Sequence, residues 1–109
     1  MRLGLSAGAT GLLRRLIQRA KIPRDRVLLI DWRSVDWQSL TFIGERHEIT
    51  LRLTGSEASV AAARMCKGLK DCEFVIPGQI VADVAVIEAF HEDENGAVTV
   101  KLEALTITE

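Results

Sequence analysis

The chain lacks the residues that build several common kinds of protein. Its 109 residues include two cysteines, two prolines and no tyrosine, and aromatic residues make up only 5%. Two cysteines cannot form the disulfide framework on which small secreted domains depend. The remaining composition, 48% hydrophobic and 27% charged, is typical of a globular domain and excludes a disordered or collagen-like chain.

Long apolar runs are also missing. No stretch approaches the roughly 20 apolar residues that a membrane-spanning helix needs. The basic N-terminal segment is not followed by the long apolar segment of a secretory signal. We therefore expect a cytoplasmic protein.

Net charge is small but unevenly distributed. The formal charge of −1 excludes a wholly basic nucleic-acid binder. However, residues 1–26 contain seven basic residues and one acid, a net charge of +6. Residues 75–109 contain one basic residue and seven acids, a net charge of −6. Such asymmetry is compatible with solvated faces, and it also suits contact with an oppositely charged partner.

The first predicted element is a basic amphipathic helix. Thr10 is placed to cap its N-terminus, which leaves residues 1–9 as an irregular lead-in. Pro23 predicts an end near Lys21. The apolar residues fall on one helical face, at Leu12, Leu13, Leu16, Ile17 and Ala20. The basic residues form a candidate contact surface for nucleic acid or an anionic membrane: Arg14, Arg15, Arg19 and Lys21.

A strand hairpin is expected next. Strand structure begins over Val27–Trp32, and residues 49–54 alternate apolar and polar side chains. A tight turn at Gly44-Glu45 pairs residues 36–42 with this second strand and sets Trp37 opposite Arg52. The five-residue spacing of Trp32 and Trp37 directs them to opposite faces, unless a bulge near residues 33–35 intervenes.

A second helix follows the hairpin. Thr54 and Glu57 have the spacing of a capping box, and Gly68 is a plausible C-terminal stop. Its predicted buried stripe is rich in alanine and comprises Ala58, Ala61, Ala62, Met65 and Leu69. Small side chains in such a stripe allow the helix to approach a sheet closely.

Two long strand-like segments, 79–91 and 97–108, complete the chain. Asn95-Gly96 between them favours a two-residue hairpin turn. The resulting register sets Glu88 opposite Glu103, an unfavourable pair of like charges. The side of the hairpin that carries the apolar residues also changes along its length. This change indicates either a bulge near Glu103-Ala104 or burial on both faces.

These elements predict an α+β two-layer sandwich in the order α-β-β-α-β-β. We expect a four-stranded, mainly antiparallel sheet with both helices on one face. Residues 10–109 form a single domain in this interpretation. The other face of the sheet is then open to a partner.

Few residues suggest chemistry. Trp32, Trp37, His47 and Arg52 are candidate walls of a pocket between helix and sheet. Glu88 and Glu103 are a candidate carboxylate pair for acid–base work, although a solvated pair explains them as well. The glycines match no phosphate-binding motif, and the cysteine and histidine spacings match no metal site. We assign no catalytic residue, cofactor or metal.

Three functions remain open. The first is a non-enzymatic homodimer joined through the sheet face or the edge of the C-terminal hairpin, in which the basic helix of one copy contacts the acidic hairpin of the other. The second is a small-ligand-binding protein or minor enzyme with a pocket between helix and sheet. The third is weak binding of nucleic acid or an anionic surface through the basic helix.

Overall fold

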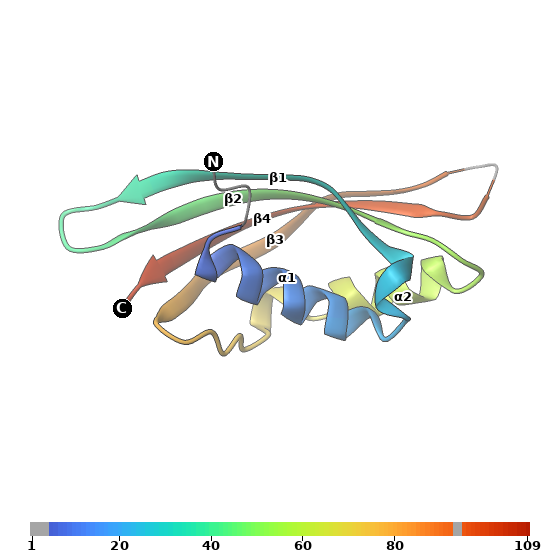
Figure 1. The fold of residues 1–109 in the computed structure, drawn as a ribbon, viewed down its shortest axis with the longest axis horizontal. Coiled ribbons are helices and arrows are strands. Elements are labelled where there is room, and N and C mark those ends of the chain that lie inside the picture. The colour runs from blue at the N-terminus through green and yellow to red at the C-terminus, as the bar shows by residue number, and fades with distance from the viewer. Residues whose placement is uncertain (1–4, 93–94) are drawn as a thin grey trace.

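The computed structural model describes residues 5–92 and 95–109. Within these ranges the chain forms α1 (Ala7–Ala20), β1 (Val27–Gln38), β2 (Ile43–Leu53), α2 (Ala58–Cys66), β3 (Gln79–His91) and β4 (Val98–Thr108). The strands form one antiparallel sheet in the order β1-β2-β4-β3. Both helices lie on one side of this sheet (Figure 1). The predicted α+β fold is therefore confirmed.

Helix α1 begins earlier than its sequence suggests. Ser6, not Thr10, is the N-cap, and its hydroxyl accepts a hydrogen bond from the Ala9 amide at 3.2 Å. Part of the predicted lead-in is therefore helical, whereas residues 1–4 lie outside the described ranges. The helix ends at Ala20, and Lys21 adopts a left-handed conformation before Pro23. The predicted end is thus correct.

The β1–β2 hairpin turns before Gly44. Ser39 and Phe42 close the turn through a backbone hydrogen bond of 2.8 Å, and β2 already begins at Ile43. Trp37 therefore lies opposite Gly44, and Arg52 lies opposite Leu28. The predicted Trp37–Arg52 pair is wrong because the turn lies four residues earlier than Gly44-Glu45. A register shift follows Leu29, upstream of Trp32, so the two tryptophans lie on opposite faces as predicted.

The β3–β4 hairpin departs from its predicted register by two residues near the turn and by three beyond the irregularity between Val86 and Glu88. Its ladder pairs His91 with Val98 and not with Val100, so the turn is not centred on Asn95-Gly96; residues 93–94 of this turn lie outside the described ranges. Along β4 the even-numbered residues stay buried from Val98 to Thr106, so the buried face of the strand does not change at Glu103-Ala104. The irregularities lie instead in β3, between Val81 and Asp83 and between Val86 and Glu88. The hairpin therefore contains irregularities of the predicted type, but they lie in β3 and not at Glu103-Ala104 of β4.

Helix α2 contains four of the five residues of its predicted buried stripe, because it ends at Cys66 and Leu69 lies in the following 3-10 helix η2 (Leu69–Asp71). Its predicted cap is absent. Glu57 occupies the N-cap without a side-chain hydrogen bond, and the Thr54 hydroxyl donates to the Arg26 carbonyl instead. The capping box is therefore not formed. The predicted stripe is buried throughout and packs with α1 and the strands around Leu12, Leu16, Leu51 and Leu102.

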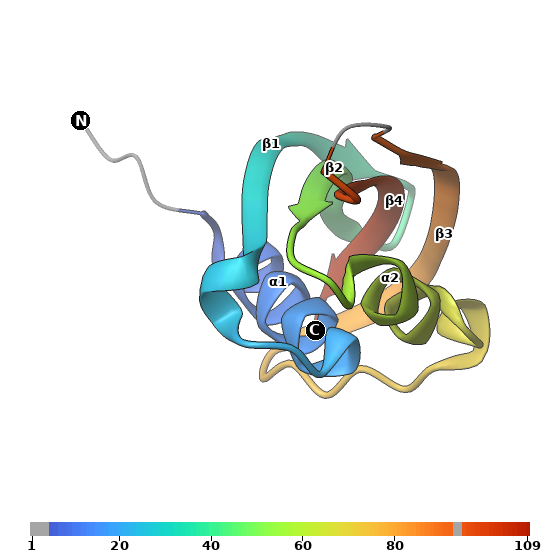
Figure 2. The ribbon, with the colours of Figure 1, turned by 90° about the vertical axis from the view of Figure 1, so that its right-hand side faces the viewer.

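The core lies between the helices and one face of the sheet. Along β2 the buried side chains are His47, Ile49, Leu51 and Leu53. Along β4 they are Val98, Val100, Leu102, Ala104 and Thr106, with Thr99 also covered. Viewed along the strands, the sheet curves above the two helices (Figure 2). The alternate side chains of β2 and β4 point away from the helices, because successive residues of a strand face opposite sides.

Candidate functional site

The sheet face that points away from the helices carries an apolar row across all four strands. Register pairs place Trp37, Gly44, Ile107 and Ile80 side by side in this order. The adjacent row contains Val35, Arg46, Leu105 and Asp83. We call the apolar members of the two rows the apolar patch: Val35, Trp37, Gly44, Ile80, Leu105 and Ile107. Val35 is 55% exposed and Ile80 is 47% exposed, so this patch lies open.

Charged residues occupy the middle of the same face. One row contains Arg33, Glu48 and Glu103, and the next contains Asp31, Lys101 and Glu88. Four of the six, Asp31, Glu48, Lys101 and Glu103, line a depression of about 280 Å³ together with Ile87. We call these six residues the charged rows; they comprise four carboxylates and two cations. The face therefore changes from apolar to acidic along its length.

The expected carboxylate pair does not form. Glu88 lies opposite Lys101, with 3.9 Å between the carboxylate Oε2 and the Lys101 Nζ. Glu103 lies opposite Glu48, which an Arg33 guanidinium approaches at 3.6 Å. The β3–β4 register, two residues from the predicted one at Glu88, produces this difference. Because all these side chains are half exposed, the ion pairs contribute little to stability.

Arg52 belongs to the far end of this sheet face. Its Nε and NH2 atoms donate to both carboxylate oxygens of Glu92, at distances between 2.7 and 3.1 Å. This fork geometry lowers the pKa of the Glu92 carboxyl through the hydrogen bonds from Arg52. Arg52 and Trp37 thus lie at opposite ends of the face and do not share a pocket wall.

Trp32 and His47, by contrast, meet on the helix side of the sheet. Their rings are 5.8 Å apart between centroids in an edge-to-face arrangement. The Trp32 indole N–H donates to Ser34 Oγ at 3.1 Å and lies 3.3 Å from His47 Nδ1. Ser34 Oγ is 2.7 Å from His47 Nδ1, and His47 Nε2 is 2.9 Å from Thr106 Oγ1. The cluster therefore joins β1, β2 and β4.

The hydrogen bonds assign a tautomer to His47. A donor indole facing Nδ1 makes that atom an acceptor, so Nε2 carries the proton and donates to Thr106. Burial lowers the pKa of His47, while the nearby Glu45 carboxylate raises it to a smaller extent. A neutral imidazole next to the Ser34 hydroxyl has the geometry of a nucleophile and its base. Ser34 also accepts the indole hydrogen bond, and we interpret the cluster as a link between strands.

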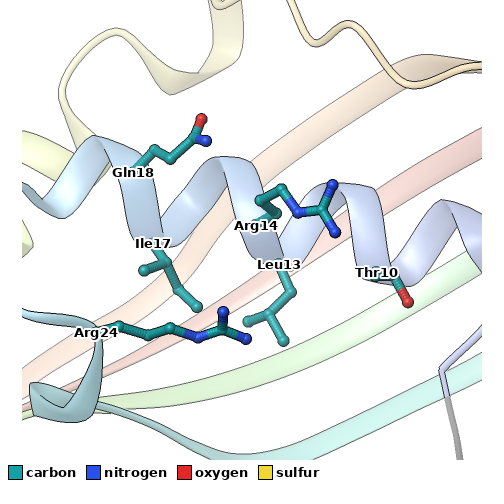
Figure 3. A pocket seen from close by; sticks show the side chains of 6 residues that line it. All are labelled: Thr10, Leu13, Arg14, Ile17, Gln18 and Arg24. Carbon is teal, nitrogen blue, oxygen red and sulfur yellow. The ribbon is translucent and has the colours of Figure 1, made fainter.

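A second feature on the helix side is a groove beside α1. It has a volume of about 340 Å³ and is lined by Thr10, Leu13, Arg14, Ile17, Gln18 and Arg24 (Figure 3). Arg24 comes from the short 3-10 helix η1 (Arg24–Arg26), and its side chain runs beside Ile17 toward Leu13. Arg14 lies near Leu13 on α1 itself. Two guanidinium groups therefore accompany a pair of apolar side chains.

The four basic residues proposed as a contact surface do not act alike. Arg19 is committed within the chain: it donates to the carbonyls of Met65 and Lys67 and to the Cys72 sulfur. It thereby ties α1 to the end of α2. Arg14, Arg15 and Lys21 are exposed. Only Arg14 of the predicted set lines the groove, together with Arg24, which the sequence reading did not select.

Comparisons with known proteins give no functional lead. No family model matches the chain. No curated protein matches it either. Within residues 5–92 and 95–109, no helix is long and apolar enough to cross a membrane. The same ranges contain no group of three or more His, Cys, Asp or Glu side chains placed to hold a metal ion.

Several site residues escaped sequence reasoning. The sequence showed that Leu105 and Ile107 are apolar but not that they share a row with Trp37 and Val35. Ser34 carried no signal, because its partner His47 depends on where the hairpin turns. Only a correct position for the β1–β2 turn would have brought these residues together.

Proposed function

We propose that the protein is a non-enzymatic assembly domain that forms a homodimer through the open face of its sheet. The single observation that carries the proposal is the apolar patch. It lies on a face that both helices leave open (Figure 1). An exposed apolar patch with a polar rim is typical of an association surface.

A second copy of the chain is the occupant that suits this patch. In a two-fold symmetric dimer the same surface contributes from both copies, and an apolar patch is complementary to itself. Gly44 keeps the centre of the apolar row flat between Trp37 and Ile107. The charged rows have an acidic surplus and would repel their own copy, so they belong at the rim.

The sheet edge is a weaker candidate than the face. Strand β3 is an edge strand, and its ladder is interrupted twice by register shifts. Bulges twist an edge strand away from regular pairing with another chain. This observation favours the face over the hairpin edge as the dimer interface.

The test is the mass in solution of the intact chain and of charged variants. Light scattering at tens of micromolar should give twice the 12.0 kDa chain mass. Val35→Glu and Ile80→Glu each place a carboxylate in the apolar patch. Each should raise the dimer dissociation constant by about tenfold or more, since each 1.4 kcal/mol corresponds to a factor of ten.

Val60→Glu is the matched control. Val60 lies on α2 and is as exposed as Val35, at 55%, so the substitution is equal in type and in burial. This variant should remain dimeric, and circular dichroism should show that all variants are folded. A wild-type mass of 12 kDa at these concentrations would reject the proposal. If Val60→Glu dissociates as readily as Val35→Glu and Ile80→Glu, the apolar patch is not the dimer interface.

A further inference from the structure

The groove beside α1 has an apolar floor that the fold does not close. Leu13 and Ile17 belong to the apolar stripe of the helix, but both remain partly exposed where Leu12 and Leu16 are fully buried. The volume of about 340 Å³ lies at the low end of the range of small-ligand sites, about 300–1,000 Å³. A short apolar chain is therefore a suitable occupant.

The groove also carries positive charge. The Arg24 side chain runs from η1 toward Leu13, and the Arg14 side chain extends from α1 on the other side of the helix (Figure 3). Among the ion pairs of the described ranges, none involves either guanidinium. Guanidinium groups bind a carboxylate through two parallel hydrogen bonds. The lining contains no aromatic side chain on which a nucleic-acid base could stack.

We propose that this groove binds the carboxylate end of a short aliphatic acid. The hydrocarbon chain lies against Leu13 and Ile17, the Arg24 guanidinium beside Leu13 binds the carboxylate, and Arg14 adds positive charge to the same groove. Thr10 and Gln18, at opposite ends of the groove, provide polar groups at its mouth. This combination of an apolar floor with a few placed polar groups is typical of a ligand site.

The site is independent of the proposed dimer. The groove is formed by α1 and η1 on the helix side, whereas the apolar patch lies on the opposite face of the sheet. Binding should therefore be equal in the wild type and in Val35→Glu. Failure of one proposal leaves the other intact, because one is measured by mass and the other by ligand titration.

The experiment titrates the intact protein with sodium decanoate below its micelle concentration, by calorimetry. We expect saturable binding. Arg14→Gln and Arg24→Gln should each raise the dissociation constant by roughly tenfold. Arg15→Gln is the matched control, because Arg15 is an exposed arginine of the same helix that does not line the groove. It should leave the constant unchanged.

Two further ligands separate the contributions of chain and charge. Acetate has the carboxylate without the chain, and octyl glucoside has a chain without the charge. Both should bind at least tenfold more weakly than decanoate. Absence of saturable decanoate binding would overturn the proposal, as would equal affinity for octyl glucoside or equal weakening by Arg15→Gln.

Discussion

At the scale of single residues, the environment of His47 has the clearest consequence for stability. It is fully buried in the sheet, with Ser34 on one ring nitrogen and Thr106 on the other. All polar side-chain atoms buried in the described ranges have a hydrogen-bond partner, and this ring is one of them. A second proton on the imidazole would turn its acceptor nitrogen into a donor facing the Trp32 N–H. The hydrogen bonds of the folded state therefore require a neutral His47 ring.

This environment makes stability depend on pH. The pKa of His47 is lowered by burial, so the unfolded chain binds a proton more readily than the folded chain. By linkage, the stabilising contribution of the neutral ring is complete above the unfolded pKa of about 6.5 and is lost as the pH falls toward the folded pKa. Urea unfolding should show lower stability at pH 5.5 than at pH 7.5.

Two histidine variants isolate the origin of this loss. His47→Gln removes the titrating ring and should flatten the change between these pH values, although the variant itself is less stable. His91→Gln removes an exposed histidine at the end of β3 and should keep the wild-type change. An unaltered pH dependence in His47→Gln would contradict the assignment.

At the scale of elements, Gly11 lets α1 pack closely against Ile76. A Cβ on Gly11 would lie 2.7 Å from Ile76 Cγ2 and 2.9 Å from Cγ1. Ile76 is itself buried, so it has little room to move. Gly11 costs the helix about 1 kcal/mol relative to alanine, and close packing against Ile76 is the reason it is tolerated.

A double-mutant cycle tests this contact. Gly11→Ala alone should destabilise the protein by about 1–2 kcal/mol, because the clash with Ile76 exceeds the gain in helix propensity. In an Ile76→Ala background the clash is removed, so Gly11→Ala should stabilise by up to about 1 kcal/mol. Urea unfolding of the four variants measures the coupling. An effect of the same sign in both backgrounds would show that Ile76 does not restrict this position.

Across the whole molecule, exposed positive charge lies on the helix side, and a surplus of negative charge lies on the opposite face of the sheet. The exposed cations Arg14, Arg15 and Lys21 lie on the helix side. The charged rows on the opposite face contain acids from β1, β2, β3 and β4, including Asp31 and Glu48. The proposed dimer therefore has a rim with surplus negative charge on both copies.

This arrangement predicts how salt affects the dimer. Added salt screens repulsion between the two acidic rims, so the dimer dissociation constant should fall as ionic strength rises. Contact between the basic helix of one copy and the acidic hairpin of another would produce the opposite trend. Sedimentation at low and high sodium chloride concentrations distinguishes these outcomes, and weakening by salt would contradict docking through the apolar patch.

Local periodicity explains how much of the fold was predictable. The α2 stripe of alanines and Met65 repeats every three to four residues, and Ile49, Leu51 and Leu53 alternate along β2, so neighbouring positions alone identify these elements. The partners of residues across neighbouring strands were harder to predict from the sequence. A turn placed four residues late moved Trp37 from Gly44 to Arg52 in the prediction. The candidate sites depend on these partners and so were only partly anticipated.

Sequence patterns alone predicted the order and kind of the elements and the end of the first helix. These follow from backbone periods of 3.6 and 2 residues, which act over short distances along the chain. Long-range strand pairing sets which residues meet: Trp32 meets His47, Glu88 faces Lys101, and Trp37 shares a row with Ile107 on the face opposite Trp32. Bulges and turn positions set this register, and each shift of one residue changes both the partner and the face.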